Sequence, residues 1–128
     1  MYIVHNNLFC YTADMAGDTI FDKILRGEIP ADVVYEDEAV LAFRDINPQA
    51  PVHVVVIPKK KTSGFDSLAE LPPEFIGRYM TGIAAAAKAL KLGNGYRVVF
   101  NMGKDGQQTV PYIHAHILGG RLLAWPPG

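Results

Sequence analysis

The chain has 128 residues, of which 49% are hydrophobic and 20% charged, a composition typical of one globular domain and not of a disordered chain. Its net charge of −1 argues against a specific nucleic-acid partner, because affinity for a phosphate backbone needs a concentrated cationic surface. The single cysteine, Cys10, excludes an internal disulfide and favours the reducing cytoplasm, with a nuclear or organellar location left open. No apolar run approaches the roughly 20 residues of a membrane span, so no membrane partner is expected.

Residues 1–17 are predicted to form a peripheral extension, followed by one domain over residues 18–128. The opening segment MYIVHNNLFCY is apolar, but it lacks the basic start and the cleavage site of a signal peptide. Asp18 or Thr19 is expected to cap a short helix that runs to about Arg26, with Gly27 as its stop. The apolar residues of this helix fall on one stripe, which predicts packing on a sheet: Ile20, Phe21, Ile24 and Leu25.

The following segments alternate between strand and helix patterns. Residues 33–35 and 39–43 predict a hairpin, and residues 52–57 predict a strand buried on both faces. The lysines at 59–61 are interpreted as a solvated loop, with weak attraction of a nucleotide or RNA phosphate as the alternative. Residues 72–92 predict a long helix stopped by Gly93, with a core stripe of Phe75, Ile76, Tyr79, Met80, Ile83, Ala87 and Leu90.

Two more strands are predicted over residues 96–101 and 110–118, separated by a turn-rich loop. The order is therefore helix, hairpin, strand, helix and two strands. This order predicts an α+β fold with a mainly antiparallel, five-stranded sheet, one short and one long helix, and both helices on one side of the sheet.

His114 and His116 stand two residues apart in the last predicted strand. Side chains alternate across a strand, so both imidazoles and Tyr112 should share one face, and their apolar neighbours the other. Two imidazoles on an apolar strand are costly unless polar groups meet them. One interpretation is that the two histidines are purely structural and lie in the core, where backbone groups satisfy their hydrogen bonds. The pair and the nearby glycine-rich loop favour a functional site.

Metal binding and nucleophilic catalysis are the two chemistries to compare. Zinc needs three or four protein ligands, and the remaining histidines are His53 and His5, so neither a metal nor another cofactor is expected. A neutral imidazole is a competent nucleophile near neutral pH, which favours His114 in that role. His116 could be its protonated partner, and His53 is the candidate for fixing its tautomer. Residues 106–109 offer N–H, amide and hydroxyl groups that can hold a phosphate without a metal.

Several segments, in order and spacing, make the chain resemble the histidine triad superfamily, and within it the HINT branch of purine nucleoside phosphoramidases. They are TIFDKILRGEIPA, LAFRDINPQAPVHVVVIPKK, GYRVVFN, DGQQTV, HAHILGGR and the terminal WPPG. The resemblance implies a homodimer in which two five-stranded sheets join into one of ten strands. It also implies a purine mononucleotide or nucleoside phosphoramidate as the ligand.

The resemblance further implies a role for each matching residue. His114 corresponds to the nucleophile that carries the nucleotide, His116 to the group that serves the leaving amine, and His53 to a supporting histidine. Asp45 corresponds to the ribose binder, and Trp125 to a tail residue that reaches the partner's site. The remaining nucleotide contacts would be Phe21, Ile24, Phe43, Ile46, Asn101, Gln107, Gln108 and Thr109.

Two residues depart from the family pattern. Tyr112 stands where the first histidine of the triad is expected, and a tyrosine that crowds His53 or His114 would leave a nucleotide-binding or scaffold protein with weak or no catalysis. Gln107 stands where glycine is usual, and a side chain there resists a positive φ, which could reshape the phosphate loop.

Overall fold

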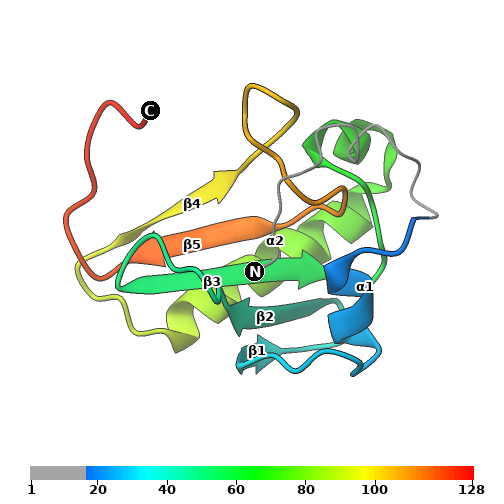
Figure 1. Ribbon diagram of the computed structural model, residues 1–128, viewed down its shortest axis with the longest axis horizontal. Coiled ribbons are helices and arrows are strands. Elements are labelled where there is room, and N and C mark those ends of the chain that lie inside the picture. The colour runs from blue at the N-terminus through cyan, green and yellow to red at the C-terminus, as the bar shows by residue number, and fades with distance from the viewer. Residues whose placement is uncertain (1–16) are drawn as a thin grey trace.

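The computed structural model describes residues 17–128, so the predicted extension lies outside the described residues except for Gly17. The elements, in chain order, are α1 (Ile20–Leu25), β1 (Val33–Glu36), β2 (Val40–Arg44), β3 (Val52–Pro58), the 3₁₀ helix η2 (Phe65–Glu70), α2 (Pro73–Ala89), β4 (Tyr96–Phe100) and β5 (Ala115–Gly119) (Figure 1). The predicted order is confirmed, and η2 is an additional element that was not predicted. No helix among these elements is long and apolar enough to cross a membrane.

The five strands form one antiparallel sheet in the order β1-β2-β3-β5-β4. The predicted hairpin is the β1–β2 pair, closed by Asp37, whose N–H donates to the carbonyl of Val40. The Asp37 carboxylate also accepts the N–H groups of Ala39 and Val40, which fixes the turn. The predicted α+β fold with a five-stranded antiparallel sheet is therefore confirmed.

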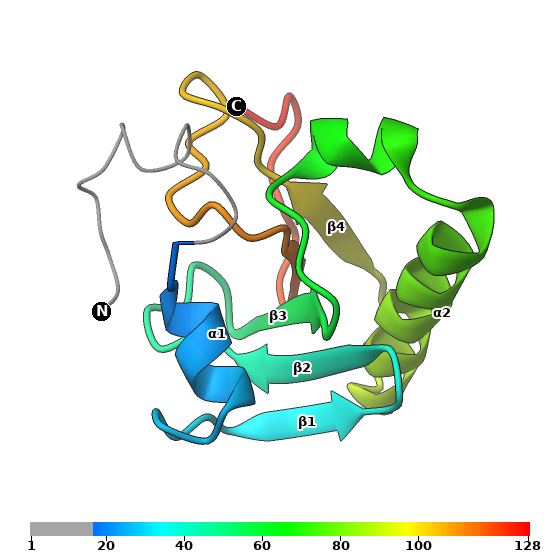
Figure 2. The same ribbon diagram turned by 90° about the vertical axis from the view of Figure 1, so that its right-hand side faces the viewer.

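The two helices lie on opposite faces of the sheet, which corrects the prediction that both lie on one side (Figure 2). One buried cluster joins α2 to residues such as Val54 and Ile117, and a second joins α1, through Phe21, to Val55 and Ile57. The reason lies in the central strands: residues 54–57 of β3 are all buried, so each face needs its own apolar cover.

The contact between α2 and the sheet is closer than an ordinary side chain would permit. A Cβ atom on Gly82 would lie 2.6 Å from Val40 Cγ1, so glycine is what allows this approach. The buried face of α2 consists of Tyr79, Gly82, Ile83, Ala86 and Ala87. Met80, which was predicted as core, is 39% exposed because it lies beside this face of the helix and not on it.

The ends of the helices follow local chemistry. Thr19 caps α1, and its hydroxyl accepts from the N–H groups of Phe21 and Asp22 in a capping box. Gly27 follows α1 with φ of 79°, as the prediction required. At the end of α2 the left-handed residue is Lys91, with φ of 55°, and not the predicted Gly93.

β5 is shorter than predicted, because residues 110–114 do not pair as a regular strand. Pro111 has no N–H to donate, and Tyr112 donates its own N–H back to the carbonyl of Val110 at 2.8 Å. Ile113 donates to Thr62 at 2.7 Å, outside the sheet ladder. The chain therefore reaches β5 through a turn, and His114 lies directly before the strand.

Candidate active site

The side chains of residues 112–117 still alternate, even though the strand begins at Ala115. Ile113, Ala115 and Ile117 lie in the α2-side cluster, whereas Tyr112 packs with the α1-side cluster. The rings of His114 and His116 are 4.9 Å apart between centroids, on the α1 side of the sheet. The two histidines thus share a face, with Tyr112 beside them.

His114 is buried, and its ring lies edge-on to Phe21 with 4.9 Å between centroids. Its Nδ1 is 2.8 Å from the carbonyl oxygen of Tyr112. A carbonyl oxygen only accepts hydrogen bonds, so Nδ1 carries the proton and Nε2 keeps its lone pair. Burial lowers the pKa of His114, outweighing the hydrogen bond to Tyr112, which favours the neutral nucleophilic form.

His53 was predicted to fix the tautomer of His114. In the structure it contacts His116 and not His114. Its Nε2 lies 2.8 Å from Nδ1 of His116 instead. In the sheet His116 pairs with Val55, so the two rings meet diagonally across β3 and β5. The tautomer of His114 is set within its own segment, by the carbonyl two residues earlier.

The tautomers of His53 and His116 follow from a main-chain donor. Gln49 donates its N–H to Nδ1 of His53 at 3.0 Å, so the proton of His53 sits on Nε2. That proton points at Nδ1 of His116, which leaves the proton of His116 on Nε2. Burial lowers the pKa of His116 to about 3, with like charge on His114 and His53 adding to the effect. His116 is therefore a neutral donor in the free protein, which corrects the prediction of a protonated partner.

Asp45 comes directly after β2, next to the histidines. Its Oδ1 accepts the N–H of Asn47 at 2.8 Å, and its Oδ2 lies 3.4 Å from Nε2 of His53. Its side chain is 6% exposed. Asp45 thus shapes the turn after β2 and places a carboxylate beside the histidine pair.

A cavity of about 540 Å³ lies between α1 and the ends of β1 and β2. Five residues predicted to contact the nucleotide line it: Phe21, Ile24, Phe43, Asp45 and Ile46. The other lining residues were not predicted as nucleotide contacts: Ile20, Ile29, Pro30, Ala31, Asp32 and Arg44. Residues 29–31 could have been found from their position between the apolar helix and the hairpin. The walls are mostly apolar, and Phe21 joins the cavity to His114.

The loop before His114 is held by two of its own amide side chains. Gln108 is buried: its Oε1 accepts the N–H of Gly103, and its Nε2 donates to the carbonyls of Ser63 and Val110. Asn101 donates from Nδ2 to the carbonyl of Gly106 at 2.7 Å. These N–H groups, predicted to meet a phosphate, instead brace the loop.

Gln107 and Thr109 are exposed in the same loop. Gln107 adopts φ of 61°, so the chain keeps a left-handed residue here without glycine, at a cost of roughly 1–2 kcal/mol. Its N–H donates to the carbonyl of Lys104 at 3.0 Å, which holds the turn. The loop thus tolerates the departure that was expected to reshape it.

The C-terminal tail, which holds Trp125, lies away from α1. In Figure 1 the C-terminal tail and α1 stand at opposite ends of the molecule. The Trp125 side chain is 79% exposed, and the guanidinium carbon of Arg97 lies 5.7 Å from the centre of its ring. Trp125 is not among the residues that line the cavity beside α1.

Asp45, His53 and His116 form a group whose candidate metal-ligating atoms lie within 4.8 Å of one another. Two observations oppose zinc in this arrangement. Nitrogen ligands stand roughly 3.3 Å apart in a tetrahedral zinc site, whereas His53 Nε2 and His116 Nδ1 are 2.8 Å apart and share a proton. A histidine that ligates through Nε2 also donates from Nδ1, yet Gln49 donates to that atom of His53. The residues as arranged do not fit a zinc ion.

Acid is expected to destabilise the fold through these histidines. Burial lowers the pKa of His53, His114 and His116 below the ordinary value, so the unfolded chain binds protons that the folded chain does not. Stability is therefore retained above about pH 6.5 and falls as the pH drops below it, by up to about 1.4 kcal/mol per pH unit for each histidine. Thermal unfolding between pH 7.5 and 4.5 measures the loss. Imidazole NMR signals of His114 and His116 that titrate near pH 6.5 would contradict it.

Comparison with known proteins gives one consistent family. The HIT domain model matches residues 26–123. An uncharacterised HIT-like protein of Synechococcus elongatus is 51% identical over 114 residues, covering 89% of this chain and all of the relative. A 14 kDa zinc-binding protein of Zea mays is 54% identical over 112 residues, covering 86% of this chain and 88% of the relative.

Solved structures agree with this assignment. A HIT family hydrolase of Legionella pneumophila superposes with a TM-score of 0.78 at 44% identity, covering 87% of this chain and all of the other. A histidine triad nucleotide-binding protein of Candida albicans gives a TM-score of 0.71 at 30% identity, covering 85% of this chain and 83% of the other. The chain therefore belongs to the HIT domain family and has the fold of its hydrolases.

Proposed function

We propose that the protein hydrolyses purine nucleoside 5′-phosphoramidates to a nucleoside monophosphate and an amine. The observation that carries this proposal is the hydrogen bond from Nδ1 of His114 to the carbonyl of Tyr112, which leaves Nε2 free of a proton. This nitrogen belongs to a ring that packs on Phe21, a wall of the apolar cavity. Such a substrate needs a nucleophile beside an apolar cavity that can take its base.

The reaction would take two displacements. With the phosphoryl anion bound, His116 takes up a proton from solvent and becomes an imidazolium. In the first displacement, Nε2 of His114 bonds to phosphorus, the P–N bond breaks, and the leaving amine takes the Nε2 proton of this imidazolium, so that His116 returns to its neutral form. In the second, water attacks phosphorus, its proton goes to His116, and the bond to His114 breaks. The bound phosphoryl anion favours the protonated form of His116, because a negative charge beside this histidine raises the pKa that burial had lowered.

The cavity between α1 and the hairpin would hold the purine. Its apolar walls suit a flat aromatic base, and Asp45 stands at the side nearest the histidines, where a ribose hydroxyl could reach its carboxylate. Gln107 and Thr109, exposed in the loop before His114, remain our candidates for phosphate contacts. The Candida albicans relative, which is named a nucleotide-binding protein, is in line with this ligand class.

The alternative function is a nucleotide-binding or scaffold protein with weak or no catalysis, because Tyr112 stands in place of the first histidine of the triad. The Tyr112 hydroxyl donates to the carbonyl of Pro58 at 2.5 Å, and its ring packs on Phe21. The side chain is thus held along β3, while its main-chain carbonyl orients His114. We infer that the tyrosine is compatible with turnover.

Turnover of adenosine 5′-phosphoramidate by the pure protein is the experiment that tests the proposal. We expect turnover in the presence of a strong chelator, because the chemistry assigned to His114 and His116 needs no metal. The name of the Zea mays relative makes zinc binding the competing function. Loss of turnover on chelation that zinc restores would favour that function, as would stoichiometric zinc binding that requires His53.

We also propose that the protein is a homodimer joined along β4, which lies at an edge of the sheet. The chain exposes apolar side chains on this strand and on the tail near it: Tyr96, Val98, Leu122 and Trp125. Pairing two β4 edges would give ten strands and cover this surface.

Sedimentation should accordingly give about twice the chain mass of 14.0 kDa. Removing residues 122–128 should alter the preference among phosphoramidates more than it alters stability, if the tail reaches the partner's site. A monomer, or a truncated protein with unchanged selectivity, would contradict this proposal.

A further inference from the structure

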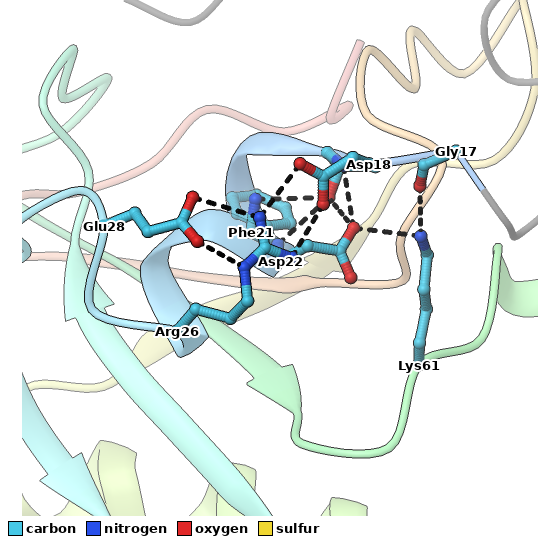
Figure 3. A network of polar contacts seen from close by, with 8 residues as sticks. Gly17, Asp18, Phe21, Asp22, Arg26, Glu28 and Lys61 are labelled. Atoms are coloured by element: carbon cyan, nitrogen blue, oxygen red, sulfur yellow. Dashed lines mark hydrogen bonds and ion pairs between the residues drawn. The ribbon is translucent and has the colours of Figure 1, made fainter.

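Lys61 does not behave as the solvated loop lysine that the sequence suggested. Its side chain is 18% exposed, and its Nζ lies 2.9 Å from Oδ2 of Asp22, a carboxylate that is equally buried. The same Nζ donates to the carbonyl of Gly17 (Figure 3). Lys61 belongs to the segment between β3 and η2, so these contacts join that segment to the start of α1.

Lys61 also borders the residues that set the geometry of His114. Its Nζ lies 5.8 Å from the ring centre of Tyr112, the residue whose carbonyl orients His114. In α1, Asp22 is directly preceded by Phe21, whose ring contacts both His114 and Tyr112. One ammonium group thus pairs with α1 and lies near the ring of Tyr112, and both α1 and Tyr112 adjoin His114.

The carboxylate of Asp22 has two tasks. Its Oδ2 accepts the N–H of Thr19 at 2.7 Å and the Thr19 hydroxyl at 2.9 Å, which completes the capping box of α1. The same oxygen accepts from Lys61. A six-residue helix is marginal by itself, so its position depends on such tertiary contacts.

We propose that Lys61 is a positioning residue of the site, holding α1 against the segment after β3 so that Phe21 closes the base cavity beside His114. This inference rests on the proposed function. Without the ammonium group, α1 would retain its cap but lose its link to that segment. The base cavity would then widen, while the hydrogen bond from His114 to the Tyr112 carbonyl would persist.

The test compares Lys61→Met with Lys61→Arg and with Lys60→Met. AMP binding is measured by calorimetry. The values of kcat and KM are measured with adenosine 5′-phosphoramidate as the substrate. Lys61→Met should weaken AMP binding and raise KM by about fivefold or more, the value of a partly buried ion pair, with kcat changed by less than about twofold. Lys61→Arg should restore most of the affinity, since arginine can still pair with Asp22. Lys60, the exposed neighbour, should tolerate the same substitution.

A general loss of stability is separated from positioning by Arg26→Met. Arg26 pairs with Asp18 and Glu28 on the solvent side of the same helix, with about half of its side chain exposed (Figure 3). This variant should leave KM unchanged. Equal AMP affinity in Lys61→Met and Lys60→Met would overturn the inference, as would a KM that rises equally in Arg26→Met. A protein that binds AMP but does not turn over phosphoramidate would refute the proposed chemistry, while the AMP measurements would still decide the role of Lys61.

Discussion

Replacing His114 with alanine is expected to abolish phosphoramidate hydrolysis, with a loss of more than about 10⁴-fold in kcat. The variant lacks the only nucleophile that the proposed mechanism provides, and His116 cannot replace it, because its Nδ1 is occupied by His53. AMP binding should change little, since the cavity walls remain in place. Steady-state kinetics with the pure variant, beside calorimetric titration with AMP, measure both effects.

A covalent trap provides the control for this prediction. Wild-type protein, denatured at alkaline pH during a single turnover so that the acid-labile P–N bond survives, should carry one nucleotide on His114, detected by mass spectrometry of its peptides. His116→Gln should still form this adduct, but about 10² to 10⁴ times more slowly, because it loses a proton donor and keeps the nucleophile. Full activity in His114→Ala, or a nucleotide attached to another residue, would refute the covalent mechanism.

Replacing Tyr112 with alanine is expected to lower the free energy of unfolding by about 3–5 kcal/mol, the usual cost of removing a buried aromatic ring. The ring is fully buried, and it packs on Phe21 within the cluster below α1. Its loss opens a cavity beside the histidines and leaves the carbonyl of Pro58 without its hydroxyl donor. Activity should fall as well, because the segment that orients His114 loses its anchor. Urea denaturation measures the change in stability.

Tyr112→Phe separates the ring from its hydroxyl. This variant should lose only about 1–3 kcal/mol, the cost of one unsatisfied buried carbonyl. It should retain most of its turnover, since the main-chain carbonyl that orients His114 is unchanged. Equal stability of Tyr112→Ala and wild type, or an inactive Tyr112→Phe with a native fold, would contradict this account.

The sequence by itself determined the local features of the fold. Thr19 and Asp22 form the cap of α1, Gly27 ends it, and Asp37 closes the hairpin, each through contacts within a few residues. The alternation of side chains placed His114 and His116 on one face, because that period belongs to any extended chain. The family resemblance supplied the cavity residues, five of which line one pocket.

Other features depended on distant parts of the chain. His53 and His116 are 63 residues apart, and their contact follows from the register of β3 against β5. A neutral histidine pair of this kind has no local signal, so its lowered pKa values could not be predicted from the sequence. The burial of Lys61 likewise depends on Asp22, 39 residues away.

The late start of β5 and the placement of the two helices also depended on tertiary contacts. Pro111 was visible in the sequence, but the partner of the Ile113 N–H, the carbonyl of Thr62, was not. The strongly apolar β3 indicated burial on both faces, yet not which helix would cover each. Patterns within a few residues follow from backbone geometry, whereas partners across the sheet are decided by which packing buries the most apolar surface while pairing every polar group.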